Sequence, residues 1–388
     1  MRLLTIATDP NAGGSAISLL NLLIGLKNSG IEIMVIIPRK GFLSDHLYLN
    51  KIKYTTIPYL RYSIWPPTKS FKDKMLFVPR FICWRLLEYL SRKKIIELAT
   101  KFKPDIIHSN VSLFSAGYFA AKALGIPHLW HIREYGNLDF DLSFFPSKRR
   151  QIELLKETQS IAITSGLKEY FGLGDKCHVI YNGIKSQNDV IYNPHKKDFY
   201  LFVGHVNPNK GVTDLIKAFI EYRQEGGKLK LVIVGRYEKS YKSQLISLLQ
   251  KEQLTNFVLF MGQIDNVDTF MQNAKALIIP SKYEGFGRIT AEAMFNGCLT
   301  IGRNTGGTKE QYELGHKITG EDIGFPFLTI SGLKDVMLKV DNIPNDINEK
   351  MIFKSQKFAT KFFSIENNIK STIEYLTEIK SNSNKSKI

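Results

Sequence analysis

Short apolar runs alternate with amphipathic stretches along most of this 388-residue chain. The runs have the length of buried strands, and the stretches between them repeat apolar residues with helical spacing. Alternating strands and helices predict parallel sheets covered by helices on both faces. The pattern stops in a polar stretch at 185–198 and starts again with a strand at 199–203. We therefore expect an α/β protein of two doubly wound, Rossmann-like domains that face a central cleft, where ligands bind.

The polar stretch at 185–198 has no apolar periodicity and is interpreted as the linker between the domains. We predict an N-terminal domain at 1–183 and a C-terminal domain at 184–363, which suits the length of the chain. A terminal helix is predicted to about residue 380, with a break near 363–365. The last residues, 381–388, are polar and are expected to form a disordered tail.

The most informative stretch is 276–297, which predicts a strand, a glycine-bearing loop and a helix that begins near Arg288. The start of a helix offers N–H groups and a positive dipole end, which suit a phosphate. Glu284 on the loop and Glu292 in the helix would repel a phosphate, so we interpret them as acceptors for hydroxyl groups. Phosphate and hydroxyl groups together indicate a sugar nucleotide. The alternative is an ordinary solvated helix start, where acids are also favoured.

In each half of the chain, one further loop follows the opening strand. Open α/β sheets bind ligands at this position. Gly13 and Gly14 lie in the first loop, which is not a GxGxxG fingerprint and either admits a ligand close to the backbone or forms a plain tight turn. The second loop, 204–211, carries Lys210, which could reach a phosphate as a point charge. His131 ends another predicted strand and is a candidate site residue, although a lone histidine is often structural.

Composition is ordinary for a globular protein, but charge is not. Hydrophobic residues make up 44% and charged residues 23%, whereas the formal net charge is +17. The excess leans toward 1–183, with 25 Lys and Arg against 14 Asp and Glu. Three separate cysteines without a CxxC pair argue against a disulfide framework or a zinc site. The short apolar run at the N-terminus and the lack of a long apolar segment predict a soluble protein, or one attached only to a membrane surface.

The segment 61–103 mixes cationic and aromatic residues, with a helical pattern from about Met75 to Phe102. A basic amphipathic helix can lie on anionic lipid. Cations and aromatics also suit nucleic acid. A third interpretation is a domain-surface helix whose aromatic residues face the core.

Five segments, taken in order, resemble the retaining, two-domain GT-B glycosyltransferases of family 4, also called glycosyl transferases group 1. The strongest is 280–294, which carries the E-x7-E signature in Glu284 and Glu292. The others are the loops and strand ends at 11–15, 130–136, 202–212 and 304–310. The resemblance implies that 1–183 binds the acceptor, that 184–363 binds the nucleotide sugar, and that the helix at about 364–380 packs back on the N-terminal domain.

The resemblance also implies roles for single residues. Glu292 would accept hydrogen bonds from the ribose, Glu284 would hold hydroxyl groups of the transferred sugar, and Lys210 would neutralise the diphosphate. His131 would contact the donor sugar or its phosphate, and Gly13 or Gly14 would line the reaction centre. The expected backbone contacts are Phe286 and Gly287 near the phosphate and Gly262, Gln263 and Ile264 near the base.

One position departs from the family pattern. His205 stands where the family usually has an arginine on the diphosphate. A neutral imidazole is a poor substitute for a guanidinium. Arg236, Arg288 or a protonated His205 would therefore have to compensate.

The implied reaction is transfer of a sugar from a nucleoside diphosphate to a hydroxyl group, with retention at the anomeric carbon. The main task is to stabilise charge on the leaving diphosphate, so no cofactor and no metal is expected. Asp139 and Asp141 resemble a DxD metal motif, but such pairs are common. The expected acceptor is a saccharide or lipid-linked saccharide of bacterial-type surface polysaccharide or glycolipid synthesis. The expected location is the cytoplasm or the inner face of the plasma membrane.

Three alternatives remain at this point. A nucleotide-sugar epimerase of the same fold would need no acceptor. A non-catalytic nucleotide-sugar-binding protein would bind donor without turnover. Nucleic-acid binding is motivated by charge alone and is not expected, because none of the motifs supports it.

Overall fold

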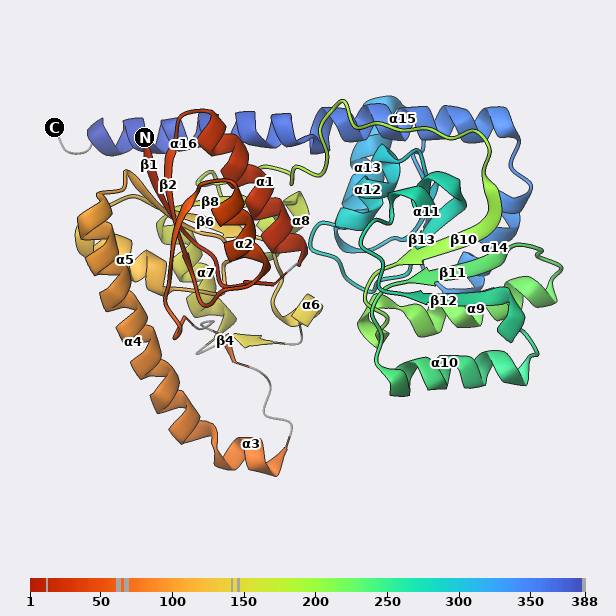
Figure 1. Ribbon diagram of the computed structural model, residues 1–388, viewed down its shortest axis with the longest axis horizontal. Coiled ribbons are helices and arrows are strands. Elements are labelled where there is room, and N and C mark those ends of the chain that lie inside the picture. Colours follow the sequence, from red (N-terminus) through yellow and green to blue (C-terminus); the bar gives the residue numbers. More distant parts are fainter. Residues whose placement is uncertain (12, 61–63, 66–69, 141, 145–146, 386–388) are drawn as a thin grey trace. The chain divides into compact units, whose positions relative to one another are not determined.

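The computed structural model of the protein describes residues 1–11, 13–60, 64–65, 70–140, 142–144 and 147–385. The chain divides into two compact units, each with its own parallel sheet (Figure 1). Unit 1 comprises Met1–Gly183 and Ile365–Ile388, and unit 2 comprises Ile184–Ser364. The prediction of an α/β protein with two doubly wound domains is confirmed.

Seven parallel strands form the sheet of unit 1, in the order β3-β2-β1-β5-β6-β8-β9. The chain adds β2 and β3 on one side of β1 and then adds the other strands on the opposite side. The order therefore reverses between β1 and β5, where open sheets bind ligands at the carboxyl ends of the strands. The strands are β1 (Arg2–Ile6), β2 (Glu32–Ile37), β3 (Lys53–Thr56), β5 (Ile106–Ser109), β6 (His128–Ile132), β8 (Gln159–Ala162) and β9 (Cys177–Val179).

Helices cover both faces of this sheet. One face packs against α1, α2 and α16, whose buried residues include Leu23 and Leu376, and the other packs against α4 and α5 through residues such as Ile95 and Ala120. A separate pair of short antiparallel strands joins β4 (Ile64–Trp65) to β7 (Ser143–Phe144). The helices are α1 (Gly14–Asn28), α2 (Phe42–Leu49), α3 (Phe71–Met75), α4 (Phe77–Phe102), α5 (Ala116–Leu124), α6 (Asn137–Phe140), α7 (Lys148–Glu157), α8 (Ser165–Tyr170) and α16 (Ile365–Lys385).

Six parallel strands form the sheet of unit 2, in the order β12-β11-β10-β13-β14-β15. The strand order reverses between β10 and β13. The strands are β10 (Lys197–Val203), β11 (Lys230–Val234), β12 (Val258–Gly262), β13 (Ala274–Ile279), β14 (Thr300–Arg303) and β15 (Phe325–Phe327). The helices are α9 (Val212–Gln224), α10 (Lys239–Lys251), α11 (Asp268–Asn273), α12 (Arg288–Phe295), α13 (Gly306–Thr319), α14 (Ile330–Asp341) and α15 (Asn345–Phe363), with short 3-10 helices at Pro208–Lys210 and Thr255–Phe257.

The stretch interpreted as a linker is part of unit 2. The backbone N–H of Ile191 donates to the carbonyl of Phe295 (3.0 Å), and the ring of Tyr192 lies 4.9 Å from that of Phe353. The stretch lacks periodicity because it forms a turn at 186–189 and has no helix or strand before β10 begins at Lys197. The chain passes between the units at Gly183–Ile184 and at Ser364–Ile365.

The predicted disordered tail is wrong for its first five residues, because α16 continues to Lys385. Residues 386–388 lie outside the described part of the chain. The residues from 365 to 385 include neither proline nor glycine, so no helix breaker interrupts the hydrogen-bond ladder of α16. A polar composition alone therefore did not mark the end of the helix.

Candidate functional site

The loops that follow β10 and β13 meet where the strand order of unit 2 reverses. The backbone N–H of Lys282 donates to the carbonyl of Asn209 (3.2 Å), which ties the two loops together. The start of α13 joins them, because the N–H of Gly307 donates to the carbonyl of Glu284 (2.8 Å). Three segments that are distant in sequence thus form one cluster at the carboxyl ends of the strands.

Two glycines permit these close approaches. Gly211 has a φ of +69°, and a Cβ there would lie 2.0 Å from the carbonyl oxygen of Pro280. A Cβ on Gly307 would lie 2.2 Å from the carbonyl oxygen of Phe286. Neither distance is possible for a side chain, so the cluster requires glycine at both positions.

Lys210 and Glu284 form an ion pair in this cluster. The Lys210 Nζ lies 2.6 Å from the Glu284 Oε1, and both side chains are partly exposed. The side chain of Asn207 accepts a hydrogen bond from the backbone N–H of Lys210 (2.9 Å), which fixes the short 3-10 helix that carries the lysine. The structure therefore brings together two of the predicted site residues, which lie on different loops.

Glu292 forms a second ion pair one turn into α12. The Arg288 Nε lies 2.6 Å from the Glu292 Oε1. Burial raises the pKa of Glu292, and the positive charge of Arg288 opposes that shift. The Lys185 ammonium, itself paired with Asp268 at 2.6 Å, also favours the carboxylate.

The start of α12 is held by its neighbour α13. Gly287 adopts a φ of +78° and precedes the first helical residue, Arg288. The side-chain amide of Gln311 donates to the carbonyls of Phe286 (2.6 Å) and Gly287 (3.1 Å). Because Gln311 of α13 holds both carbonyls, the loop that leads into α12 has a defined conformation.

The remaining predicted donor residues lie at the ends of β10, β11 and β12. The backbone N–H of Gly235 donates to the carbonyl of Gly262 (2.7 Å), which connects the last two strand ends. Gln263 is exposed and Ile264 is half-buried. His205 is also exposed, and its Nδ1 lies 3.2 Å from the Asn207 side-chain amide. The exposed Arg236 follows β11, and its carbonyl accepts from the N–H of Val206 (2.8 Å).

In unit 1, Gly13 and Gly14 form the start of α1, directly after β1. A Cβ on Gly13 would lie 2.9 Å from a carboxylate oxygen of Asp9, so this loop is also closely packed. The first turn of α1 contains no acid, which leaves its positive dipole end without a carboxylate from the helix itself.

His131 lies in a buried chain of polar groups across β1, β5 and β6. Its Nδ1 is 3.2 Å from the Nε2 of His108, whose Nδ1 is 3.3 Å from the Thr5 hydroxyl. Burial lowers the pKa of His131, and it lowers the pKa of His108 to about 3. Both imidazoles are therefore neutral at physiological pH.

The proton of the His131 ring can be assigned from its neighbours. An amino group of Arg133 lies 3.4 Å from the His131 Nδ1, and a guanidinium can only donate. The Nδ1 is therefore an acceptor, and the proton of the neutral ring is on Nε2. This buried Nε2 has no hydrogen-bond partner within the part of the chain that the structure describes.

Arg133 and Glu134 follow His131 and are both buried. The guanidinium of Arg133 donates to the side-chain carbonyls of Asn110 (2.9 Å) and Asn182 (2.7 Å). Glu134 accepts from the backbone N–H and the hydroxyl of Ser112, and burial raises its pKa to about 7. Sequence reasoning singled out His131 but assigned no role to His108, Asn110 or Asn182. For His108 and Asn110 the signal was a polar end on the otherwise apolar strand β5, whereas Asn182 lies three residues after β9 and had no such signal.

Asp139 has a structural role. Its carboxylate accepts from the backbone N–H groups of Tyr135 (2.8 Å) and Gly136 (2.7 Å), which stabilises the turn before α6. Asp141, the other half of the DxD pair, lies outside the described residues. Across the described ranges, no three His, Cys, Asp or Glu residues are grouped in a way that suits a metal ion.

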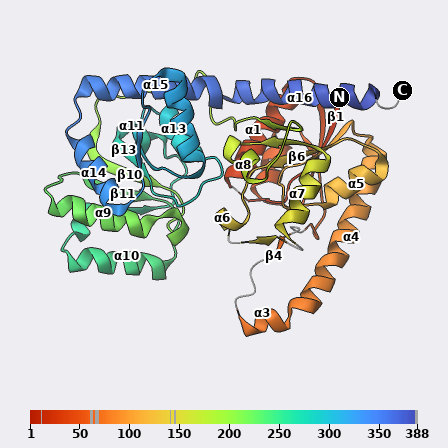
Figure 2. The same ribbon diagram turned by 180° about the vertical axis from the view of Figure 1, so that it is seen from behind.

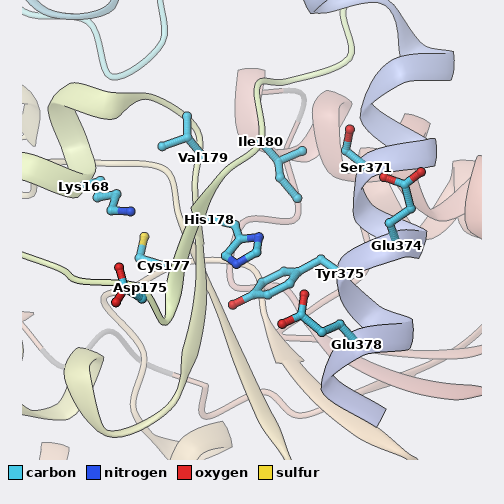
Figure 3. A pocket seen from close by; sticks show the side chains of 10 residues that line it. All are labelled: Lys168, Asp175, Cys177, His178, Val179, Ile180, Ser371, Glu374, Tyr375 and Glu378. Carbon is cyan, nitrogen blue, oxygen red and sulfur yellow. The ribbon is translucent and has the colours of Figure 1, made fainter. Parts of the chain in front are cut away.

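A pocket of about 610 Å³ in unit 1 contains none of the predicted site residues (Figure 3). It lies where α16 meets the edge strand β9. The Tyr375 ring stacks on the His178 imidazole with centroids 3.9 Å apart, and its hydroxyl donates to Gln159 (2.9 Å). These contacts attach α16 to the sheet.

Two family models match the chain. One described as Glycosyltransferase Family 4 covers residues 12–188, and one described as Glycosyl transferases group 1 covers residues 184–322. A protein described as an uncharacterized glycosyltransferase of Methanocaldococcus jannaschii is 26% identical over 279 residues, which cover 70% of this chain and 71% of that one. The lipopolysaccharide 1,2-N-acetylglucosaminetransferase of Salmonella typhimurium is 29% identical over 164 residues, 40% of each chain.

Solved structures confirm the fold. The crystal structure of Anabaena HepE in complex with UDP has a TM-score of 0.77 at 17% identity and covers 97% of this chain and 100% of that one. The two family models divide the chain near residue 184, where the structure also passes from unit 1 to unit 2. The predicted family and its GT-B fold are confirmed, and the chain belongs to the GT-B glycosyltransferases described by these two models.

Proposed function

We propose that the chain transfers a sugar from a nucleoside-diphosphate sugar to an acceptor hydroxyl group, with retention at the anomeric carbon and without a metal ion. The observation that carries this proposal is the Lys210–Glu284 pair, 2.6 Å apart where β10 and β13 end. One cation and one carboxylate, on the two segments that lead into α9 and α12, match the two ends of such a donor, its diphosphate and its sugar hydroxyl groups.

In the free protein these charges neutralise each other. A bound donor would separate them, because its diphosphate would take Lys210 and its hydroxyl groups would donate to Glu284. The second pair would divide in the same way, with Glu292 accepting from the ribose and Arg288 released toward the diphosphate. His205 occupies the position where the family usually has an arginine that binds the diphosphate. Arg288 is therefore our candidate to take over that role.

The chemical step that we propose needs positive charge where the diphosphate leaves. Lys210 and the N–H groups at the start of α12 would supply it, so a divalent ion would not be required. Neither glutamate is proposed as a nucleophile, because Glu284 would bind the sugar hydroxyl groups and Glu292 the ribose. The Nε2–H of His131 is a donor without a partner in the described part of the chain. We propose that it donates to the donor sugar or its phosphate.

We further propose that unit 1 binds the acceptor, a saccharide or lipid-linked saccharide of surface polysaccharide or glycolipid synthesis. The Salmonella relative is named for lipopolysaccharide, and a Campylobacter jejuni relative, 29% identical over 130 residues, for a diphospho-undecaprenol acceptor. Such acceptors suggest work in the cytoplasm at the inner face of the plasma membrane. We propose no nucleic-acid partner.

The test replaces Glu284 with alanine. A panel of nucleotide sugars is first screened by thermal shift, and the donor that stabilises the protein is then followed by hydrolysis and transfer. Glu284→Ala should reduce turnover on the order of hundredfold or more, a loss typical of one transition-state contact. Nucleoside-diphosphate affinity should change little because Lys210 and Glu292 remain.

The matched control is Glu313→Ala, which removes an exposed acid from α13 in the same unit. It should leave turnover unchanged. Near-full activity of Glu284→Ala would contradict the assignment. An altered sugar nucleotide formed without acceptor would indicate an epimerase, and donor binding without turnover in the wild type would indicate a binding protein.

A further inference from the structure

The first half of α4 and the short helix α3 carry apolar side chains toward solvent. Val78, Ile82, Leu86 and Tyr89 are spaced by four, four and three residues, so they form one stripe along α4. Their exposure runs from 46% for Tyr89 to 63% for Ile82. Phe71 and Met75 extend the exposed apolar surface onto α3. We call these six residues the apolar stripe.

The second half of α4 is anchored in unit 1. Ile95 and Ala99 are fully buried in the core on that face of the sheet, and the Ser91 hydroxyl donates to the carbonyl of Tyr59 (3.1 Å). Both views show α3 and the first half of α4 standing away from the sheet of unit 1 (Figures 1 and 2). The core therefore fixes the direction of α4, whereas in the described first half of the helix only Trp84 is buried.

The whole segment that contains α3 and α4 is basic. Residues 70–103 contain nine Lys and Arg against three acids. The acids are already matched, since Asp73 pairs with Arg80 (2.9 Å), Glu88 with Arg85 (2.7 Å) and Glu97 with two lysines. Among the described residues, Lys72 and Lys74 of α3 have no carboxylate partner, and neither do Arg92, Lys93 and Lys103 in and just after the anchored half of α4.

The charge decides between possible occupants of the stripe. A second copy of this helix would cover the apolar residues but would oppose cation to cation. Nucleic acid would neutralise the cations and leave the apolar side chains in water. An anionic lipid surface satisfies both, because headgroups pair with the cations and the acyl boundary accepts the apolar face.

We infer that α3 and the first half of α4 form a membrane-insertion arm, with the apolar stripe buried at the boundary between headgroups and acyl chains of an anionic bilayer. The helix would lie in the plane of the interface. Among the described residues no helix is long and apolar enough to cross a bilayer, so the arm would lie on the membrane rather than span it. The inference rests on the proposed function for its purpose, since a lipid-linked acceptor would be met at this surface.

The first experiment measures flotation of the full chain with phosphatidylcholine vesicles, with and without phosphatidylglycerol. The wild type should bind the anionic vesicles and bind the neutral ones weakly. Ile82→Glu combined with Leu86→Glu should reduce binding to the anionic vesicles roughly hundredfold, because it places two charges on the inserted face. Both side chains are exposed, so the fold should be retained.

Matched controls separate the stripe from general surface effects. Tyr48→Glu combined with Leu49→Glu replaces two even more exposed large hydrophobic residues of α2 in the same unit and should leave binding unchanged. Lys72→Gln with Lys74→Gln should weaken anionic binding roughly thirtyfold, as expected for two cations near the surface. The same change at the exposed Lys228 and Lys230 of unit 2 should not.

A second readout uses Cys83, which is exposed on α4, whereas Cys177 and Cys298 are buried. A polarity-sensitive thiol probe on Cys83 should shift its emission to the blue with anionic vesicles and not with neutral ones. Equal binding of the stripe and control variants, or an unshifted probe, would overturn the inference. So would a wild-type dimer that the stripe variant converts to a monomer. Donor hydrolysis without lipid should be the same in all variants, so this inference can fail while the proposed function stands.

Discussion

At the scale of single residues, the charged side chains of the candidate site form ion pairs. Lys210 is held by Glu284 and Arg288 by Glu292, each at 2.6 Å. The Lys210–Glu284 pair is partly exposed, and such pairs contribute little to stability, so folding alone explains it poorly. Both pairs keep a cation available for a diphosphate, and that supports the proposed donor site.

Glu134 differs from these paired residues, because burial disfavours its charged form. It is buried, its ionised form is disfavoured by desolvation, and its pKa is raised to about 7. The folded protein binds a proton at Glu134 more tightly than the unfolded chain does. The contribution of this proton to the free energy of unfolding is therefore fully present below the ordinary carboxyl pKa near 4.5. That contribution is lost as the pH rises from about 4.5 to about 7.

Glu134→Gln should remove this pH dependence. Glutamine keeps an oxygen that can accept from Ser112 but does not ionise. Thermal unfolding from acid to mildly alkaline pH should therefore show the variant gaining on the wild type between about pH 4.5 and pH 7, by up to about 3 kcal/mol. Glu169→Gln, at an exposed position of α8, is the control and should follow the wild type. Parallel curves for Glu134→Gln and the wild type would show that Glu134 ionises freely in the fold.

At the scale of elements, the glycine-bearing loops decide whether the site forms. The course of 276–297 was predictable, because an apolar run, a proline, glycines and a helical pattern are local signals. The Lys210–Glu284 pair was not predictable from local signals, because it depends on β13 lying beside β10. β11 and β12 lie between β10 and β13 in sequence. Neither the β10 segment nor the β13 segment alone therefore indicates that these two strands pair. The order of the family's motifs supplied what the local pattern lacked.

The arm formed by α3 and α4 shows a different limit. Its helical periodicity was evident, but apolar residues occur on more than one side of the helix. Trp84, Ile95 and Ala99 face the protein, whereas Val78 and Ile82 face solvent. Nothing in the spacing tells which apolar side meets the core, because that depends on where α5 packs.

Gly211→Ala tests the loop packing. The change should lower the unfolding temperature and reduce donor hydrolysis, because a Cβ would collide with the Pro280 carbonyl and displace the adjacent Lys210. Gly320→Ala is the control, since Gly320 has nearly the same φ (+73° against +69°) but open space around it. The control should cost about 1 kcal/mol for the left-handed backbone, and Gly211→Ala roughly 3 kcal/mol or more. Equal shifts would mean that the loops adjust freely.

At the scale of the whole molecule, each of the two units has core clusters of its own. Leu376 of α16 is fully buried with residues of β1, α1 and α2 in unit 1, although it lies after the whole of unit 2 in sequence. Leu333 of α14 is fully buried in the main core of unit 2. Unit 1 is therefore complete only when the last helix of the chain has been made.

This arrangement predicts that the two cores respond separately to cavities. Leu376→Ala should destabilise unit 1 by about 2–5 kcal/mol, because the buried leucine leaves a cavity that the helix and sheet fill only in part. Hydrogen exchange measured by mass spectrometry should then accelerate in β1 and β2 and remain unchanged in β10 and β11. Leu333→Ala is the reciprocal variant and should accelerate exchange in β10 and β11 alone. Acceleration of both sets of strands by either variant would show that the units unfold as one, and α16 would then be a brace for the whole chain rather than a part of unit 1.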